Sequence, residues 1–440
     1  MVEAVRNHVG WLRVVMRRAG CTTTTWIQGR GAVGDVPNGS PARRDFARLA
    51  VLVALAAAAV GTLGRGPAVA QPAAPSTGPA GDSPGWLNQT DLFVSGKEGY
   101  TAYRIPALVV SAKGTMLAIC EGRRKSFSDS GDIDLVMRRS LDDGRTWEKM
   151  RLIWDDAENT VGNPCPVVDR QTGTVWLPFC WNNRRVLVMK STDEGVTWSK
   201  PVEITKDVSQ SRWTWYATGP GHEIQLRSGR LLIPCDHKLD NATKQQPELY
   251  YSHVFYSDDH GATWKLGGSV GPHTNECEAV ETEDGLVYLN MRSYHGKNRR
   301  AYAWSRDGGL TWSEVKLDEA LVEPRCQASI ARLSDRSGGG KSRILFSNPA
   351  STERVNLTVR LSYDECRTWP VSRVLHPGKC AYSDLAVARD MTICCLYERG
   401  EKGPYERITL ARFNLEWLTG GADRLAGSGS EPIEGGAGAR

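Results

Sequence analysis

The octapeptide Ser-Leu-Asp-Asp-Gly-Arg-Thr-Trp at residues 140–147 decides the fold, because close copies of it recur along the chain. Copies with the pattern Ser-x-Asp-x-Gly-x-Thr-Trp occupy 191–198, 257–264 and 305–312, and their starts follow one another at intervals of 51, 66 and 48 residues. A fifth copy at 362–369 begins 57 residues later and has Cys366 in place of the glycine. This period predicts a repeat architecture in which each unit is one small sheet with its loops.

Each copy follows a short run of β-forming residues and has the composition of a tight turn. The aspartate can accept backbone N–H hydrogen bonds, the glycine permits a positive φ, and the tryptophan can pack back on the sheet. Further β-like runs lie at 115–120, 174–181, 231–235 and 343–346, and no stretch has sustained helical periodicity. These features predict an all-β propeller, with the five aspartates as turn residues rather than metal ligands or catalytic acids.

The two ends of the chain differ in composition from the repeat region. Arg43 and Arg44 precede an apolar run over 49–63 and the pattern Ala68-Val69-Ala70, which is typical of an export signal cleaved before Gln71. An uncleaved signal anchor is the alternative, although the run is short for a membrane span. We expect an exported protein with an N-terminal extension and signal over 1–70, a Pro/Ala/Gly-rich linker over 71–90, a propeller over 91–418 and a disordered tail over 419–440.

The formal net charge of +5 belongs to the N-terminal segment. Residues 1–70 hold nine arginines and three acidic residues, so the remainder carries a net charge of about −1. This balance argues against nucleic acid as a partner. Ten of the eleven cysteines follow Gln71 and form no CxxC pair or Cys/His metal spacing, so we interpret most of them as small core residues. We expect a monomer without metal, cofactor or membrane span.

A second set of motifs lies between the turns and carries charged and phenolic side chains. The motifs are, in order, Tyr103-Arg104-Ile105-Pro106, Glu121-Gly122-Arg123, Phe127-Ser128-Asp129-Ser130-Gly131, Asn275-Glu276-Cys277-Glu278, Asn290-Met291-Arg292, Ser351-Thr352-Glu353-Arg354, Ala381-Tyr382-Ser383-Asp384 and Leu396-Tyr397-Glu398. Each motif alone is a weak signal. Three arginines, an aspartate, a glutamate and a tyrosine in this order, threaded among the turns, would rarely coincide by chance.

Over about residues 92–415 this set resembles the sialidases, whose repeated turns are called Asp-boxes. The resemblance implies a six-bladed β-propeller and an enzyme that removes terminal sialic acid from glycans. It implies that Arg104, Arg292 and Arg354 clamp the substrate carboxylate, as bidentate guanidinium groups can. It also implies that Arg123 holds the carboxylate or the 4-position of the sugar, and that Glu398 orients Arg104.

The resemblance implies an acid, a nucleophile and a base as well. Asp129 stands at the position of the acid/base residue, Tyr382 at that of the nucleophile and Glu276 at that of the base that activates it. A carboxylate nucleophile would be repelled by the carboxylate on the anomeric carbon of sialic acid, and a neutral tyrosine avoids this repulsion. Glu278 and Glu281 are less favoured alternatives to Glu276.

Some positions near these motifs remain open. Arg124 competes with Arg123, and Asp132 and Asp134 compete with Asp129. The aromatic run over 212–216 is either part of a substrate pocket or ordinary packing between blades, and the family often has glycine where this chain has Glu223.

We therefore expect a retaining exo-α-sialidase acting on sialylated glycoproteins, glycolipids or oligosaccharides. A non-catalytic propeller that binds sialylated glycans would keep the arginines but would not need Tyr382 and Glu276 together. A propeller glycosidase for neutral glycans has no use for three clustered arginines. A trans-sialidase differs in an acceptor site that the sequence does not reveal.

Overall fold

The computed structural model describes residues 2–6, 11–18, 21–28, 85–239 and 249–425, and the chain forms two units, residues 1–77 and 78–440. The first unit contains one antiparallel sheet of β1 (Val2–Arg6), β2 (Trp11–Arg18) and β3 (Cys21–Gln28). The sequence predicts only an extension here. The β-branched residues at 14–15 and 22–25 explain the strands, because such residues favour β structure even without alternating polar and apolar positions. The predicted export signal and its cleavage point lie outside the described residues.

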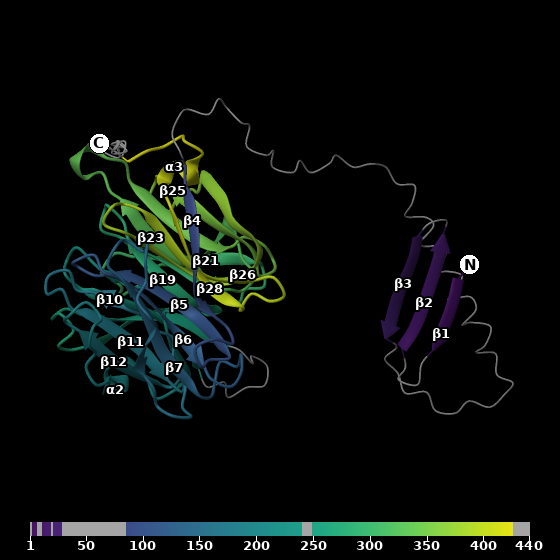
Figure 1. Cartoon of the computed structure of the whole chain (residues 1–440), viewed down its shortest axis with the longest axis horizontal. Coiled ribbons are helices and arrows are strands. Elements are labelled where there is room, and N and C mark those ends of the chain that lie inside the picture. The colour runs from purple at the N-terminus through teal and green to yellow at the C-terminus, as the bar shows by residue number, and fades with distance from the viewer. Residues whose placement is uncertain (1, 7–10, 19–20, 29–84, 240–248, 426–440) are drawn as a thin grey trace, which may run out of the picture. The chain divides into compact units, whose positions relative to one another are not determined.

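The second unit is built from antiparallel sheets whose strands mostly follow one another in chain order (Figure 1). The first sheet holds β5 (Ala102–Val110), β6 (Met116–Arg123), β7 (Ile133–Ser140) and β8 (Arg151–Trp154). The next holds β9 (Val161–Gly162), β10 (Val167–Val168), β11 (Val175–Trp181), β12 (Arg185–Ser191) and β13 (Val202–Glu203). The third holds β14 (Trp213–Thr218), β15 (Ile224–Gln225), β16 (Leu231–Leu239), β17 (Tyr250–Ser257) and β18 (Lys265–Val270). The fourth holds β19 (Thr274–Glu281), β20 (Val287–Ser293), β21 (Arg299–Ser305) and β22 (Lys316–Val322).

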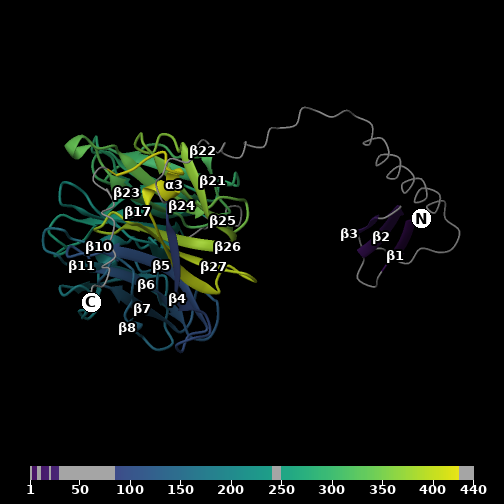
Figure 2. The same cartoon turned by 45° about the horizontal axis from the view of Figure 1, so that its top comes forward.

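The last sheet of this unit has seven strands and joins the two ends of the domain. It contains β23 (Ser329–Ser334), β24 (Arg343–Pro349), β25 (Val355–Ser362), β26 (Val371–Val387), β27 (Ile393–Gly400), β28 (Arg407–Phe413) and β4 (Leu87–Val94). Strand β4 comes first among the described strands of the second unit and pairs with β28, the last of them, as Figure 1 shows; Figure 2 gives a second view of β4 on this sheet. Helices α2 (Thr205–Val208), η1 (Ser337–Gly339) and α3 (Leu415–Thr419) are short. The fold is an all-β propeller, as the repeat predicted.

All five repeats form the same hydrogen-bonded turn at the end of a strand. In the second copy Asp193 accepts hydrogen bonds from the Thr197 backbone N–H (2.9 Å), the Thr197 hydroxyl (2.6 Å) and the Ser191 hydroxyl (2.8 Å). The hydrogen bonds from Thr197 lower the pKa of Asp193 to about 2. The corresponding aspartates of the other copies, Asp142, Asp259, Asp307 and Asp364, make the same contacts. The prediction that these aspartates build turns is confirmed.

Cys366 keeps the geometry of the glycines that it replaces. Its φ of 65° lies near those of the matching residues, such as Gly195 at 74° and Gly144 at 79°. The Cys366 N–H also donates to the Ser362 hydroxyl (3.0 Å), as the glycine N–H does in the other copies. The fifth turn is therefore formed, although a left-handed backbone is costly for a residue with a Cβ.

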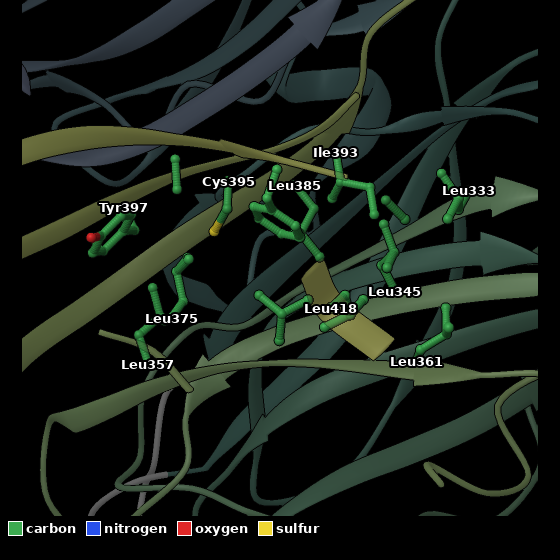
Figure 3. Packing of buried hydrophobic residues seen from close by; sticks show 14 of the residues in the cluster. Leu333, Leu345, Leu357, Leu361, Leu375, Leu385, Ile393, Cys395, Tyr397 and Leu418 are labelled. Atoms are coloured by element: carbon green, nitrogen blue, oxygen red, sulfur yellow. The ribbon is translucent and has the colours of Figure 1, made fainter. Parts of the chain in front are cut away.

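The core of the seven-stranded sheet is closed by the C-terminal helix. Figure 3 shows Leu345, Leu361, Leu385 and Ile393 gathered around Leu418 of α3, and all of these side chains are almost fully buried. The ten cysteines in the described part of the second unit are all buried and free, in agreement with their interpretation as core residues.

The packed region extends beyond both boundaries that the sequence suggested. At the C-terminal end, the buried Asp423 accepts hydrogen bonds from Arg343 Nε (2.7 Å) and Nη2 (2.9 Å), so the fold continues past residue 418. At the N-terminal end, β4 already begins at Leu87, within the predicted linker. No helix in the described ranges is both long and apolar enough to cross a membrane.

Candidate active site

One polar pocket of about 370 Å³ collects nearly all the side chains that the motifs singled out. Arg104, Arg123, Asp129, Glu276, Arg292, Arg354 and Tyr382 line it, and Glu398 lies directly behind Arg104. These residues come from three sheets of the second unit and from loops between their strands. Folding therefore brings together residues that lie as much as 294 positions apart in the sequence.

Three of the pocket residues lie at register shifts of the kind that β-bulges produce in their strands. The ladder between β5 and β6 shifts register between Arg104 and Ala107, and that between β19 and β20 shifts between Thr274 and Cys277. A third shift, between Cys380 and Ser383, brackets Tyr382. An extra residue in one strand turns its side chain out of the regular alternation, which is how bulges commonly serve active sites. Glu276 and Tyr382 have no partner inside these shifts, and Arg104 is the last paired residue before the first of them.

A tyrosine, a glutamate and an arginine form the centre of the pocket. The Tyr382 hydroxyl donates a short hydrogen bond to Glu276 Oε1, and Arg292 Nη1 contacts both Glu276 Oε2 (2.8 Å) and the Tyr382 hydroxyl (3.1 Å). Burial, and then the Glu276 charge, raise the pKa of Tyr382 well above its usual range, although Arg292 and Arg354 oppose this. The tyrosine is therefore neutral at rest and has a carboxylate in position to take its proton.

Glu398 ties the first arginine to the backbone of the tyrosine. Its carboxylate is fully buried and accepts from Arg104 Nε (2.8 Å) and Nη2 (3.3 Å). It also accepts from the backbone N–H groups of Ile105 (2.9 Å) and Tyr382 (3.1 Å). Ile105 has a φ of 59°, which is rare for a β-branched residue and is held by this contact. One carboxylate therefore sets the positions of Arg104 and Tyr382 together.

The loop between β6 and β7 presents an exposed acid at the mouth of the pocket. Asp129 Oδ1 lies 2.8 Å from Arg123 Nη1 and 3.5 Å from Arg104 Nη1, and its side chain is 73% exposed. Arg123 is itself buried and is held by Glu121 through Nε (2.9 Å) and Nη2 (2.6 Å). Asp129 is thus accessible from solvent while two arginines fix its position.

The third predicted clamp residue is oriented by a phenol instead of an acid. Arg354 Nη1 donates to the Tyr405 hydroxyl (2.5 Å), and Nη2 donates to the Arg325 carbonyl (3.3 Å). The Tyr405 ring also lies 3.9 Å from Arg104 Cζ, measured to its centroid. One aromatic side chain therefore contacts two of the three clamp arginines.

The competing acids and arginine lie away from the pocket. Glu278 is buried and accepts from Ser329 and the Ile330 N–H, and Glu281 accepts from the Arg227 N–H. Arg124 pairs with Asp132, Asp134 and Asp155, and none of these four lines the pocket. The geometry thus favours Glu276, Arg123 and Asp129 over their neighbours.

The aromatic run at 212–216 divides between the pocket and packing within its own sheet, which joins β14 to β16. Trp215 lines the pocket, whereas Trp213 stacks on His237 with ring centroids 3.7 Å apart. Glu223 does not reach this pocket. It lines a different cavity with His222, and the Cys165 thiol donates to its carboxylate.

Sequence reasoning missed several residues of the pocket. Tyr405, Tyr250 and Tyr294 line it, and so does Asp236, a fully buried residue of β16. Burial, and then the nearby Glu276 charge, raise the pKa of Asp236 well above its usual range. The available signal was an aspartate directly after the apolar run 231–235 of β16, because a buried acid without a functional reason is rare.

Among the described residues, one group has the spacing of a metal site. Ligand atoms of His222, Glu278 and Asp384 lie within 4.8 Å of one another. These atoms already bond to each other and to Ser329, with His222 Nδ1 2.6 Å from Asp384 Oδ1. The group lies outside the pocket that holds Tyr382.

Comparison with known proteins shows the family of the chain. The family model described as a BNR repeat-like domain matches residues 114–395. The curated Sialidase-3 of Mus musculus is 31% identical over 404 residues, which cover 75% of this chain and 95% of that protein. The chain belongs to the BNR-repeat sialidase family. Another member, the sialidase of Micromonospora viridifaciens, is 37% identical over 402 residues, which cover 84% of this chain.

Solved structures of sialidases share the fold. The Hadza microbial sialidase Hz136 superimposes with a TM-score of 0.68 at 31% identity, covering 75% of this chain and 69% of that one. The intramolecular trans-sialidase from Ruminococcus gnavus has a TM-score of 0.65 at 18% identity, a likeness of fold alone. This sialidase-family chain spans 60% of the length of the Micromonospora sialidase and 61% of that from Bacteroides fragilis.

Proposed function

We propose that this chain is a retaining exo-α-sialidase that hydrolyses terminal sialic acid from glycoproteins, glycolipids or oligosaccharides. The observation that carries the proposal is the hydrogen bond from the Tyr382 hydroxyl to Glu276, formed beside Arg292 at the base of an arginine-lined pocket. A site for a neutral sugar would gain nothing from these arginines, and a site for binding alone would not need the tyrosine and the base in contact.

In this mechanism Arg104, Arg292 and Arg354 bind the carboxylate of the sugar and place its anomeric carbon over Tyr382. Glu276 takes the phenolic proton while the tyrosine oxygen bonds to the anomeric carbon. The bond to the leaving oxygen breaks, and Asp129 gives that oxygen its proton.

The second half of the reaction reverses these roles. Asp129, now ionised, takes a proton from water, and the water oxygen attacks the anomeric carbon. The bond to Tyr382 breaks and the proton on Glu276 returns to the phenolic oxygen. Two displacements at one carbon give retention of configuration.

We propose that the domain has six blades. Counting the seven-stranded sheet as two blades that share β26, one over β23–β26 and one over β26–β28 with β4, gives six with the four other sheets. We further propose a monomer that is exported after cleavage near Ala70 and Gln71, which rests on the sequence pattern of the leader.

The test is release of methylumbelliferone from its sialic acid conjugate. We expect turnover by the wild type and a loss of at least about a thousand-fold in Tyr382→Phe, because the nucleophile is removed. Tyr302→Phe, at a tyrosine outside the pocket, is the matched control and should keep full activity. Turnover by Tyr382→Phe close to that of the control would refute the assigned nucleophile.

The same assay separates the rival functions. A binding propeller would retain the sialoside without releasing the fluorophore. A trans-sialidase would transfer sialic acid to added lactose in preference to water. Proton NMR of the sialic acid first released shows whether it is the α-anomer, as retention predicts, or the β-anomer, as inversion would give.

A further inference from the structure

Arg325 is an exposed cation next to the carboxylate clamp that the proposed mechanism does not use. Its guanidinium carbon lies 5.4 Å from the centroid of the Tyr294 ring. Arg292 Cζ lies 5.3 Å from the same centroid, so the two guanidinium carbons are at most about 11 Å apart. Within residues 85–239 and 249–425, no acidic side chain forms an ion pair with Arg325. An unpaired guanidinium therefore stands beside the pocket.

The backbone around Arg325 is held on both sides. Before it, the buried Glu323 pairs with Arg300 (2.9 Å), and after it the Cys326 carbonyl accepts from the same guanidinium (2.6 Å). The Gln327 side chain is buried and hydrogen-bonds both the N–H and the carbonyl of Ser383 (3.0 Å each). The segment is therefore anchored to the strand that carries Tyr382.

Arg325 itself adopts an unfavourable backbone conformation. Its φ is 55°, in the left-handed region that residues other than glycine, Asn and Asp seldom occupy. Its carbonyl accepts from Arg354 Nη2 in this conformation, and its side chain extends from the surface toward Tyr294. Such strain persists where the surrounding structure enforces it, most often at ligand sites.

Counted contact by contact, the pocket offers Arg325 no acidic partner when sialic acid binds. Arg104 and Arg292 already face Glu398 and Glu276, and Arg354 faces only a phenol and a carbonyl. The carboxylate of one sialic acid balances Arg354. Arg325 then has no counter-charge in the described chain or in a substrate with a single acid group.

We propose that Arg325 recognises a second anionic group, on the sugar that follows the terminal sialic acid. The carboxylate and the leaving oxygen are attached to the same carbon. A residue whose carbonyl is bonded to Arg354 and whose guanidinium lies over Tyr294, a pocket residue, is therefore near the sugar that departs. The group is the carboxylate of a second sialic acid or a sulfate ester, both of which suit a guanidinium fork. This inference rests on the proposed sialidase function and names a preferred substrate class for it.

The experiment compares kcat/KM for three substrates, namely sialyllactose, a sialyl-sialyl-lactose and a sulfated sialyllactose. In Arg325→Gln we expect the ratio of kcat/KM on the anionic substrates to that on sialyllactose to fall about 5- to 10-fold, the worth of one partly exposed charged contact. Arg306→Gln removes an exposed charge from the fourth turn and should leave the ratio unchanged. A loss with the sialyl-sialyl substrate alone, or with the sulfated one alone, assigns the group.

Calorimetric titration into Tyr382→Phe, with and without Arg325→Gln, measures the same preference without turnover. If the wild type hydrolyses none of the three substrates, the proposed function is refuted. The titrations would still measure whether Arg325 binds the second anionic group. Equal affinities of the two proteins for all three ligands, or an equal loss for all three, would overturn the role of Arg325.

Discussion

The single substitution Glu398→Gln separates the charge of this residue from its shape. Gln has the same size, and its amide oxygen can still accept two of the four hydrogen bonds that the carboxylate receives. Its NH₂ group, however, faces N–H donors in place of an acceptor. Arg104, which is 5% exposed, also loses its closest counter-charge and keeps only the exposed Asp129 at 3.5 Å.

We expect Glu398→Gln to lower both the stability and the activity of the protein strongly, although it replaces a single oxygen atom by an NH₂ group. Removing one partner of a buried ion pair destabilises a protein by about 3–5 kcal/mol. With an unfolding entropy of about 2.1 cal/mol/K per residue over residues 85–425, a loss of about 4 kcal/mol lowers Tm by roughly 5–6 °C. We also expect kcat/KM to fall by at least about a hundred-fold, because Arg104 and the Tyr382 backbone are positioned by the same carboxylate.

Chemical denaturation and kinetics on the fluorogenic sialoside measure the two effects. Asp423→Asn is the matched control, since Asp423 is buried against Arg343 and lies outside the pocket. It should lose stability and keep kcat/KM. The reasoning fails if Glu398→Gln behaves like this control, or if it changes neither quantity.

Two further predictions concern other parts of the fold. Asp193→Ala removes the hydrogen bonds from Thr197 and should lower the free energy of unfolding by about 0.5–2 kcal/mol above pH 4, as loss of a capping aspartate does. The pKa of Asp193 is depressed, so this difference should disappear as the pH falls through about 2, which urea titrations at several pH values would show. Although burial opposes it, the Asp384 carboxylate raises the pKa of His222 to about 9, and Glu278 adds to this effect. A raised pKa stabilises the protein below pH 6.5, and the wild type should lose about 3 kcal/mol as the pH rises to 9, whereas a His222→Gln variant should lack that slope.

The turn motifs were enough to predict the propeller fold, because the hydrogen bonds that form each turn join residues close together in the sequence. Asp193 and Thr197 are four residues apart, so their hydrogen bonds follow from sequence spacing alone. The meeting of Arg104, Glu276 and Tyr382 could be expected only through resemblance to the sialidases, since their contacts depend on register shifts that no composition rule specifies.

Residues without a motif were not predicted. Tyr405 lies in a Gly- and Lys-containing turn after β27, and nothing in that turn indicates that its ring will reach Arg104. The position of Asp236 beside an apolar run was a signal, but its burial depends on residues of other sheets such as Asn275, which the sequence does not place. The change of partner along β26 was not predicted either. This 17-residue strand pairs with β25 along its first half and with β27 along its second half.

The pairing of β4 with β28 has a consequence for how the protein is made. Thr409 of β28 donates to Asp91 of β4 across 318 residues (2.6 Å). At about 5–20 residues per second, a ribosome delivers the later strand roughly 15–60 s after the earlier one. For that interval β4 of the nascent chain has an unpaired strand edge, which is a template for self-association. Slow synthesis of the last third of the chain would therefore lower the yield of native protein without touching any residue of the catalytic pocket.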